Sequence, residues 1–84
     1  MSEDWLLIAF DSTQQALRAE MLLEYADIDI DTCPTPKSIT AGCALSIQFP
    51  HERLEDVKAI IRDESVEIRG IYFKTGDGYA TINE

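Results

Sequence analysis

Two cysteines are the residues of this chain most able to do chemistry, and both lie in one polar stretch. Residues 31–43 read D-T-C-P-T-P-K-S-I-T-A-G-C, in which Cys33 is followed by P-x-P and Cys43 is preceded by glycine. An ionised thiol is a nucleophile, whereas a buried thiol behaves as a small apolar side chain. Chemistry here therefore depends on which thiol, if either, the fold exposes and activates.

The first thiol stands in a recognisable motif. Cys33-Pro34-Thr35-Pro36 resembles the C-P-x-P signature of small sulfurtransferase carriers of the persulfide-relay type, whose cysteine begins a long helix. Here the motif ends an alternating, strand-like segment, and Thr35 precedes a proline, which favours extended backbone. The sequence therefore gives Cys33 no helix of the kind that activates the thiol in that family.

The second thiol has small and neutral neighbours. In T-A-G-C-A-L no base or cation lies beside Cys43, so its local chemistry is that of a buried small residue. Activation requires Lys37 folding over the loop, or backbone amides of Ser38 to Gly42 forming a nest. Elsewhere His51 precedes acids that suit a helix start, so we predict no metal site and no cofactor.

Length and composition limit the classes of protein to consider. The chain has 84 residues, 45% of them hydrophobic and 27% charged, which is typical of one globular domain. Its formal charge of −9 argues against nucleic acids and anionic membranes as partners. No apolar run could span a bilayer and the start M-S-E-D-W is unlike a secretory signal, so we expect a cytoplasmic chain with reduced thiols.

Hydrophobic periodicity predicts two helices and four strands. The predicted strands are Trp5–Phe10, Ile28–Cys33, Cys43–Phe49 and Val66–Lys74, and the predicted helices are Thr13–Ala26 and Pro50 to about Glu64. This order predicts an α+β, ferredoxin-like βαββαβ two-layer sandwich, with an antiparallel sheet and both helices on one face. We expect one domain over residues 1–74 and a tail over 75–84, where Tyr79–Ile82 could add a short edge strand.

Strand parity separates the two thiols. If the second and third strands form a hairpin with aligned apolar faces, Cys33 lies on the aspartate side and Cys43 on the side of Leu45. A disulfide needs facing Cβ atoms, so none is expected between them. We also expect the loop over residues 34–42 at the end of the sheet opposite the helix N-termini, where neither helix would lower a thiol pKa.

The first predicted helix begins with a capping signal and carries two apolar stripes. Ser12 and Gln15 have capping-box spacing. One stripe, which includes Ala16, Ala19 and Leu23, has the spacing of a core face. The second stripe consists of Leu17, Met21 and Tyr25, roughly half a turn away. We interpret it as part of a wide core face, with a subunit interface as the alternative.

Several short motifs follow one another in a fixed order along the chain. They are S-T at Ser12-Thr13, P-T-P followed by a basic residue at Pro34–Lys37, and Cys43 in a turn rich in Ser, Thr and Gly. From about Leu6 to Phe73 their order and spacing resemble a family of very small proteins described as selenium/sulfur carrier protein-like. Two positions depart from that family, because Ala44 stands where glycine is common and Cys33 where an aliphatic strand residue is usual.

The resemblance implies a carrier or accessory protein in sulfur or selenium delivery, with protein partners as donor and acceptor. Cys43 would accept a persulfide-type sulfur. Lys37, Ser38, Thr40 and Gly42 would shape the loop and bind the terminal sulfur anion, while Cys33 would relay sulfur only if the loop moves.

Two alternatives stay open at this point, and with them whether the chain is an enzyme. One is a non-catalytic interaction module that forms a homo-oligomer through a sheet edge or the second stripe of the first helix, with both cysteines structural. The other is a small-ligand regulatory module with a pocket between the helices and the loop over residues 34–42.

Overall fold

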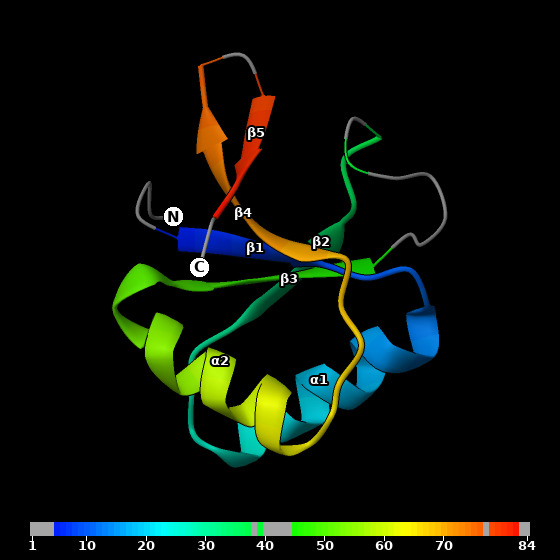
Figure 1. Ribbon diagram of the computed structural model, residues 1–84, viewed down its shortest axis with the longest axis vertical. Coiled ribbons are helices and arrows are strands. Elements are labelled where there is room, and N and C mark those ends of the chain that lie inside the picture. The colour runs from blue at the N-terminus through cyan, green and yellow to red at the C-terminus, as the bar shows by residue number, and fades with distance from the viewer. Residues whose placement is uncertain (1–4, 38, 40–44, 77, 83–84) are drawn as a thin grey trace.

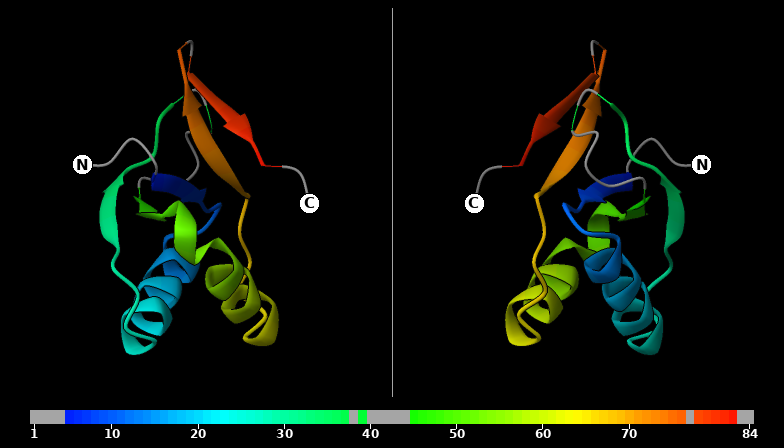
Figure 2. Two further views of the ribbon diagram at one scale, coloured as in Figure 1. Left: turned by 90° about the vertical axis from the view of Figure 1, so that its left-hand side faces the viewer. Right: turned by 90° about the vertical axis from the view of Figure 1, so that its right-hand side faces the viewer.

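The computed structural model describes residues 5–37, 39, 45–76 and 78–82. In chain order the elements are β1 (Trp5–Ala9), α1 (Thr13–Tyr25), β2 (Asp31–Pro34), β3 (Leu45–Pro50), the 3-10 helix η1 (His51–Arg53), α2 (Leu54–Asp63), β4 (Gly70–Thr75) and β5 (Gly78–Thr81). Both helices lie on one side of the sheet, and the β4–β5 hairpin projects toward the other side (Figures 1 and 2). Neither described helix is long and apolar enough to cross a membrane.

The sheet has five strands in the order β2-β3-β1-β4-β5, and every neighbouring pair is antiparallel. The α+β class and the antiparallel sheet with two helices agree with the prediction. The exact four-stranded ferredoxin-like arrangement is not matched, because β5 pairs with β4 and extends the sheet at that edge. The strand Gly78–Thr81 lies where the sequence allowed a short edge strand over Tyr79–Ile82.

Two strands begin later than their sequence pattern predicted, because each helix ends in a Schellman motif. Asp27 (φ 65°) and Ser65 (φ 54°) adopt the left-handed conformation just past the helices. The next amide in each case bonds back into the helix: Ile28 N–H donates to the Leu23 carbonyl at 3.1 Å and Val66 N–H to the Ile61 carbonyl at 3.0 Å. The apolar residue after each turn then enters the core instead of opening a strand.

The core lies between the helices and the face of the sheet that they cover. It is built from large apolar side chains on alternate strand positions and on the inner sides of the helices, among them Ile8, Phe10, Leu23, Ile47, Phe49, Val57 and Ile71. The second stripe of α1 does not take part: Leu17, Met21 and Tyr25 are 52%, 64% and 92% exposed. Our interpretation of this stripe as a wide core face is wrong, because the sheet and α2 cover only the opposite side of α1.

Candidate functional site

The loop that follows β2 leaves the sheet at the end where α1 begins. Both β1 and β2 pair antiparallel with β3, so they run in the same direction and end on the same side. Helix α1 starts shortly after β1 ends, with Ser12 as its N-cap. The expectation that this loop lies opposite the helix N-termini is therefore wrong for α1, whose partial positive charge lies at the loop's end of the sheet.

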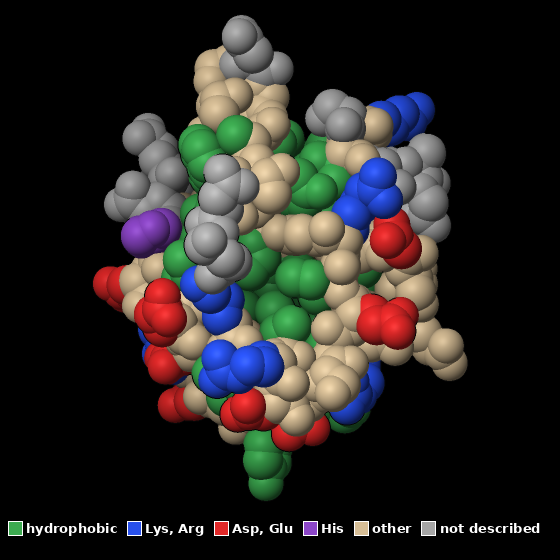
Figure 3. Space-filling view, in the orientation of Figure 1, with side chains coloured by type: hydrophobic (Ala, Val, Ile, Leu, Met, Phe, Trp, Pro, Cys, Tyr) green, Lys and Arg blue, Asp and Glu red, His purple; other side chains and the backbone are tan. Residues whose placement is uncertain are grey.

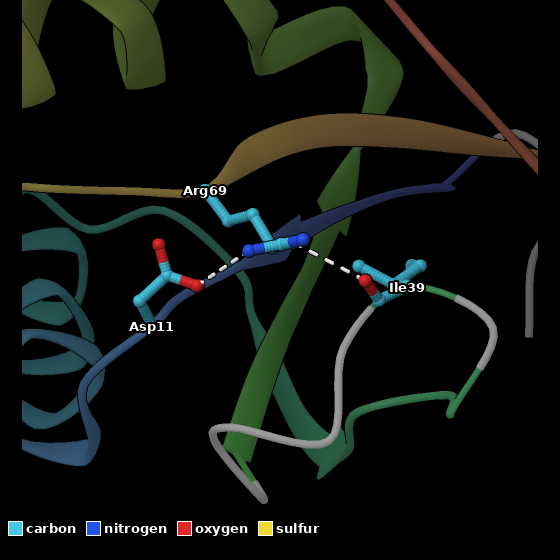
Figure 4. A network of polar contacts seen from close by, with 3 residues as sticks. All are labelled: Asp11, Ile39 and Arg69. Atoms are coloured by element: carbon cyan, nitrogen blue, oxygen red, sulfur yellow. Dashed lines mark hydrogen bonds and ion pairs between the residues drawn. The ribbon is translucent and has the colours of Figure 1, made fainter.

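Arg69 ties this loop to the start of α1. Its Nη1 lies 2.8 Å from Asp11 Oδ1, and its Nε donates to the carbonyl oxygen of Ile39 at 3.2 Å. Its backbone N–H donates to the Ala9 carbonyl at 2.7 Å, which fixes the arginine beside the last residue of β1. Figure 4 shows the guanidinium lying between the carboxylate and the carbonyl. One side chain from just before β4 thus joins two segments that are distant in sequence.

Small residues form the sheet surface at this end, on the face away from the helices. Cys33 pairs with Ser46, and Ala9 pairs with Gly70. Extending the β1–β3 register by one residue places Ala9 opposite Ser46. These four residues therefore form a row across four strands. A Cβ at Gly70 would lie 3.2 Å from the Tyr72 hydroxyl oxygen, so the tyrosine rests against the end of the row.

The first residue after β2 is bonded to this row. The hydroxyls of Thr35 and Ser46 share a hydrogen bond, in which either group can be the donor. Ser46 is 0% exposed, as is Ala9, although neither of the two described helices covers this face of the sheet. Because a buried hydroxyl without a partner is costly, this bond stabilises the loop's departure from the sheet. Residues 35–37 lie on the side of the sheet opposite the helices (Figure 1).

A tight turn follows Thr35 and presents the carbonyl that Arg69 binds. The Ile39 N–H donates to the Pro36 carbonyl at 3.0 Å. Lys37 lies in this turn and is exposed. Thr35 and Ile39 are therefore both held, one by β3 and the other by Arg69. Ser38, Thr40, Gly42 and Cys43 lie outside the described residues, so their predicted roles stay predictions.

Cys33 lies on the face that strand parity predicted. It is a free, half-buried thiol on the same side of β2 as Asp31. Burial raises the pKa of the Cys33 thiol, and the nearby Asp31 carboxylate raises that pKa further. Near neutral pH this side chain is therefore a protonated thiol and a weak nucleophile.

Sequence reasoning missed Asp11, Thr35, Ser46 and Arg69. The row of small residues was the available signal, because Ala9, Ser46 and Gly70 each interrupt a strand made mostly of larger side chains.

The predicted capping box is half formed: Ser12 Oγ accepts from the Gln15 N–H at 3.4 Å, but Gln15 Oε1 accepts from the Glu67 N–H at 3.3 Å instead of reaching back.

The charged side chains of the described ranges do not assemble a metal site. Within those ranges no three His, Cys, Asp or Glu side chains lie close enough to hold an ion. Arg69 supplies a cation at the loop's end of the sheet, although Asp11 offsets much of its charge. The arrangement can hold a loop in place and favour an anion near it more readily than it can bind a cation.

A family model described as "Putative Se/S carrier protein-like" matches residues 5–73, from the start of β1 into β4. This match includes the loop after β2 and the residues that anchor it. The searches of curated proteins and of solved structures found no match.

Proposed function

Because this chain belongs to the Se/S carrier protein-like family, we propose that it carries sulfur or selenium between proteins on the thiol of Cys43. The observation that supports this most is the Arg69 clamp, which holds Ile39 beside the start of α1. Cys43 follows Ile39 by four positions and precedes Leu45, the first residue of β3, by two. The segment with the candidate thiol thus connects two anchored parts of the chain.

The electrostatics at this end of the sheet suit an anionic sulfur. The N-terminus of α1 carries a partial positive charge, and Arg69 adds a guanidinium beside it. Positive charge near a cysteine favours its thiolate, which is the reactive form. In this proposal Lys37, Ser38, Thr40 and Gly42 complete the surroundings of the sulfur anion, and Cys33 acts only as an optional relay because its raised pKa keeps it protonated.

The transfer is an exchange at sulfur and needs no oxidant. The Cys43 thiolate attacks the outer sulfur of a donor persulfide, R–S–SH. The bond between the two donor sulfurs breaks, the donor leaves as the thiolate RS⁻, and Cys43 becomes Cys43–S–SH. Attack by an acceptor thiolate on this outer sulfur reverses the process and regenerates Cys43. An outer selenium atom would move in the same way.

Intact-mass measurement tests this proposal. The protein is incubated with a cysteine desulfurase and cysteine, and the expected result is the gain of one sulfur atom that a thiol reductant removes. Cys43→Ser should abolish the gain, while Cys33→Ser should retain it. A wild-type protein that remains unmodified, or a gain that survives Cys43→Ser, would contradict the proposal.

A further inference from the structure

Helix α1 exposes a row of large apolar side chains on its outer surface. Leu17, Met21 and Tyr25 are 52%, 64% and 92% exposed, and Phe73 at 41% is the other large exposed apolar residue among the described residues. The spacing of four residues aligns the three on one side of the helix, over a length of about 12 Å. In Figure 3, an apolar side chain protrudes at the bottom of the view, near the end of α1 as Figure 1 places it.

The border of this row is negatively charged. The cation of α1, Arg18, follows Leu17 in the sequence and forms an ion pair with Glu64 at 3.8 Å. Glu20 and Glu24, which lie beside the row on α1, form no ion pair within the described residues. The row is therefore an apolar strip beside carboxylates that are free to meet cations.

The row also lies close to the candidate site. Its first residue, Leu17, is about one helical turn from Thr13, where α1 begins. Asp11, just before that start, is bound to Arg69 and through it to Ile39. The Leu17 end of the row is thus the end nearer to Ile39, which precedes Cys43 by four positions.

We propose that Leu17, Met21 and Tyr25 form the docking surface for the protein that supplies sulfur to the loop. The donor would meet this row with an apolar centre bordered by lysine and arginine. The inference rests on the proposed function, because a persulfide attached to a protein cannot diffuse to Cys43 and must be brought there by docking. Tyr and Met are enriched in protein interfaces, where a few such anchors supply most of the binding free energy.

A second copy of this chain is a poorer occupant of the same surface. A twofold dimer through α1 would place the same patch on both partners, so Glu20 and Glu24 of each copy would approach those of the other. Each copy also carries a formal charge of −9, so two copies repel each other. Arg18 offers little relief because it pairs with Glu64. A basic partner removes both penalties.

The experiment measures the rate at which Cys43 gains sulfur from each of two donors. One donor is a cysteine desulfurase supplied with cysteine, and the other is sodium polysulfide. Met21→Glu should slow loading from the enzyme by about tenfold or more, because a charge buried at an interface anchor weakens binding of the partner by that factor. The same substitution should leave loading from polysulfide unchanged, because polysulfide needs no docking surface. Thr81→Glu adds the same charge at an exposed position of β5 and should match wild type with both donors. Equal enzyme loading of Met21→Glu and Thr81→Glu overturns the inference.

A charge experiment examines the border of the row. Glu20→Lys/Glu24→Lys should slow loading from the enzyme several-fold, and added salt should slow wild type, because the screening length falls from about 10 Å at 0.1 M to about 3 Å at 1 M. Enzyme loading that neither the charge reversal nor salt affects contradicts a basic partner. A wild-type dimer that Met21→Glu dissociates would identify a second copy as the occupant.

The outcomes separate the inference from the proposed function. If Cys43 gains sulfur from neither donor, the carrier function fails. If it gains sulfur from polysulfide but not from the enzyme, the thiol is reactive but the transfer from a protein donor, and with it the carrier function, fails. If it gains sulfur from the enzyme with no effect of Met21→Glu, the carrier function stands and the docking surface is wrong.

Discussion

At the end of the sheet where α1 begins, the two faces carry side chains of different size. The face under the helices bears Ile8, Ile47, Phe49 and Ile71, all buried in one apolar cluster. The other face, at the end where α1 begins, bears the row Cys33, Ser46, Ala9 and Gly70. The loop after β2 starts on this second face, bonded through Thr35 to Ser46.

The large side chains of the helix face contribute more to the free energy of unfolding than the polar contacts that hold the loop. Burial of a large apolar side chain contributes about 1.5–3 kcal/mol, whereas an exposed ion pair such as Arg69–Asp11 contributes about 0–1 kcal/mol. Small residues also let a loop approach the backbone of a strand closely. Substitutions on the helix face should therefore destabilise the whole fold most, and those at the loop end of the other face should cost less and act mainly on the loop.

Phe49→Ala should have the largest effect on stability. Phe49 is 0% exposed in the core, and truncation of a buried phenylalanine typically costs about 3–5 kcal/mol because it leaves a cavity. Phe73→Ala makes the same chemical change at a side chain that is 41% exposed, and should cost less than half as much. Urea denaturation of both variants measures the difference. Equal losses would remove the contrast between core and surface.

Thr35→Val should cost about 1–3 kcal/mol, because it keeps the branched shape but leaves the buried Ser46 hydroxyl without its partner. Thr35→Ser is the matched control, since it keeps the hydroxyl, and should cost less. Thr35→Val with Ser46→Ala should recover part of the loss. Denaturant midpoints of the three variants test this, and a Thr35→Val protein no less stable than Thr35→Ser would show that the bond does not hold the loop.

Local patterns in the sequence predicted the parts of the fold that depend on neighbouring residues. The periodicity of residues 13–25 and the cap at Ser12 identified α1, and parity identified the face of Cys33. The sequence predicts strands that begin at Ile28 and Val66, because an apolar residue after a helix has the same pattern whether it opens a strand or completes a Schellman motif.

The long-range contacts of the site were beyond such patterns. Arg69 and Asp11 are 58 positions apart, and nothing local to either residue indicates their ion pair. The exposure of Met21 was hidden for the same reason, because an apolar stripe has the same spacing whether or not another element covers it. The end of the sheet at which the loop lies, by contrast, follows from the strand directions alone. Our prediction that the loop lies opposite the start of α1 is therefore an error of reasoning that the sequence could have prevented.

Arg69→Ala should have little effect on the free energy of unfolding but should make the turn at Ile39 less well held. The exposed ion pair contributes about 0–1 kcal/mol, and the backbone bond from residue 69 to the Ala9 carbonyl survives the substitution. Loss of the guanidinium frees the Ile39 carbonyl, so hydrogen exchange at the Ile39 amide should become several-fold faster. Arg62→Ala removes another exposed ion pair and should leave this amide unchanged. Equal exchange rates in the two variants would mean that Arg69 does not hold the turn.

The smallest effect concerns the pH dependence of Cys33, measured by alkylation in a Cys43→Ser background. Burial and then the Asp31 carboxylate raise the pKa of this thiol, so its reaction rate should rise only above the pH range of an ordinary cysteine. Asp31→Asn should lower that midpoint only part of the way, since burial is the larger cause. The same raised pKa makes the stability of the protein depend on pH. Because the pKa of Cys33 is higher in the folded state than in the unfolded state, the stabilising effect of the protonated thiol is complete below the unfolded-state pKa. That effect is lost as pH rises through the folded-state pKa. Cys33→Ser should remove this alkaline loss of stability, and a thiol that alkylates rapidly near neutral pH would instead make Cys33 a second candidate carrier on the same face as Ser46.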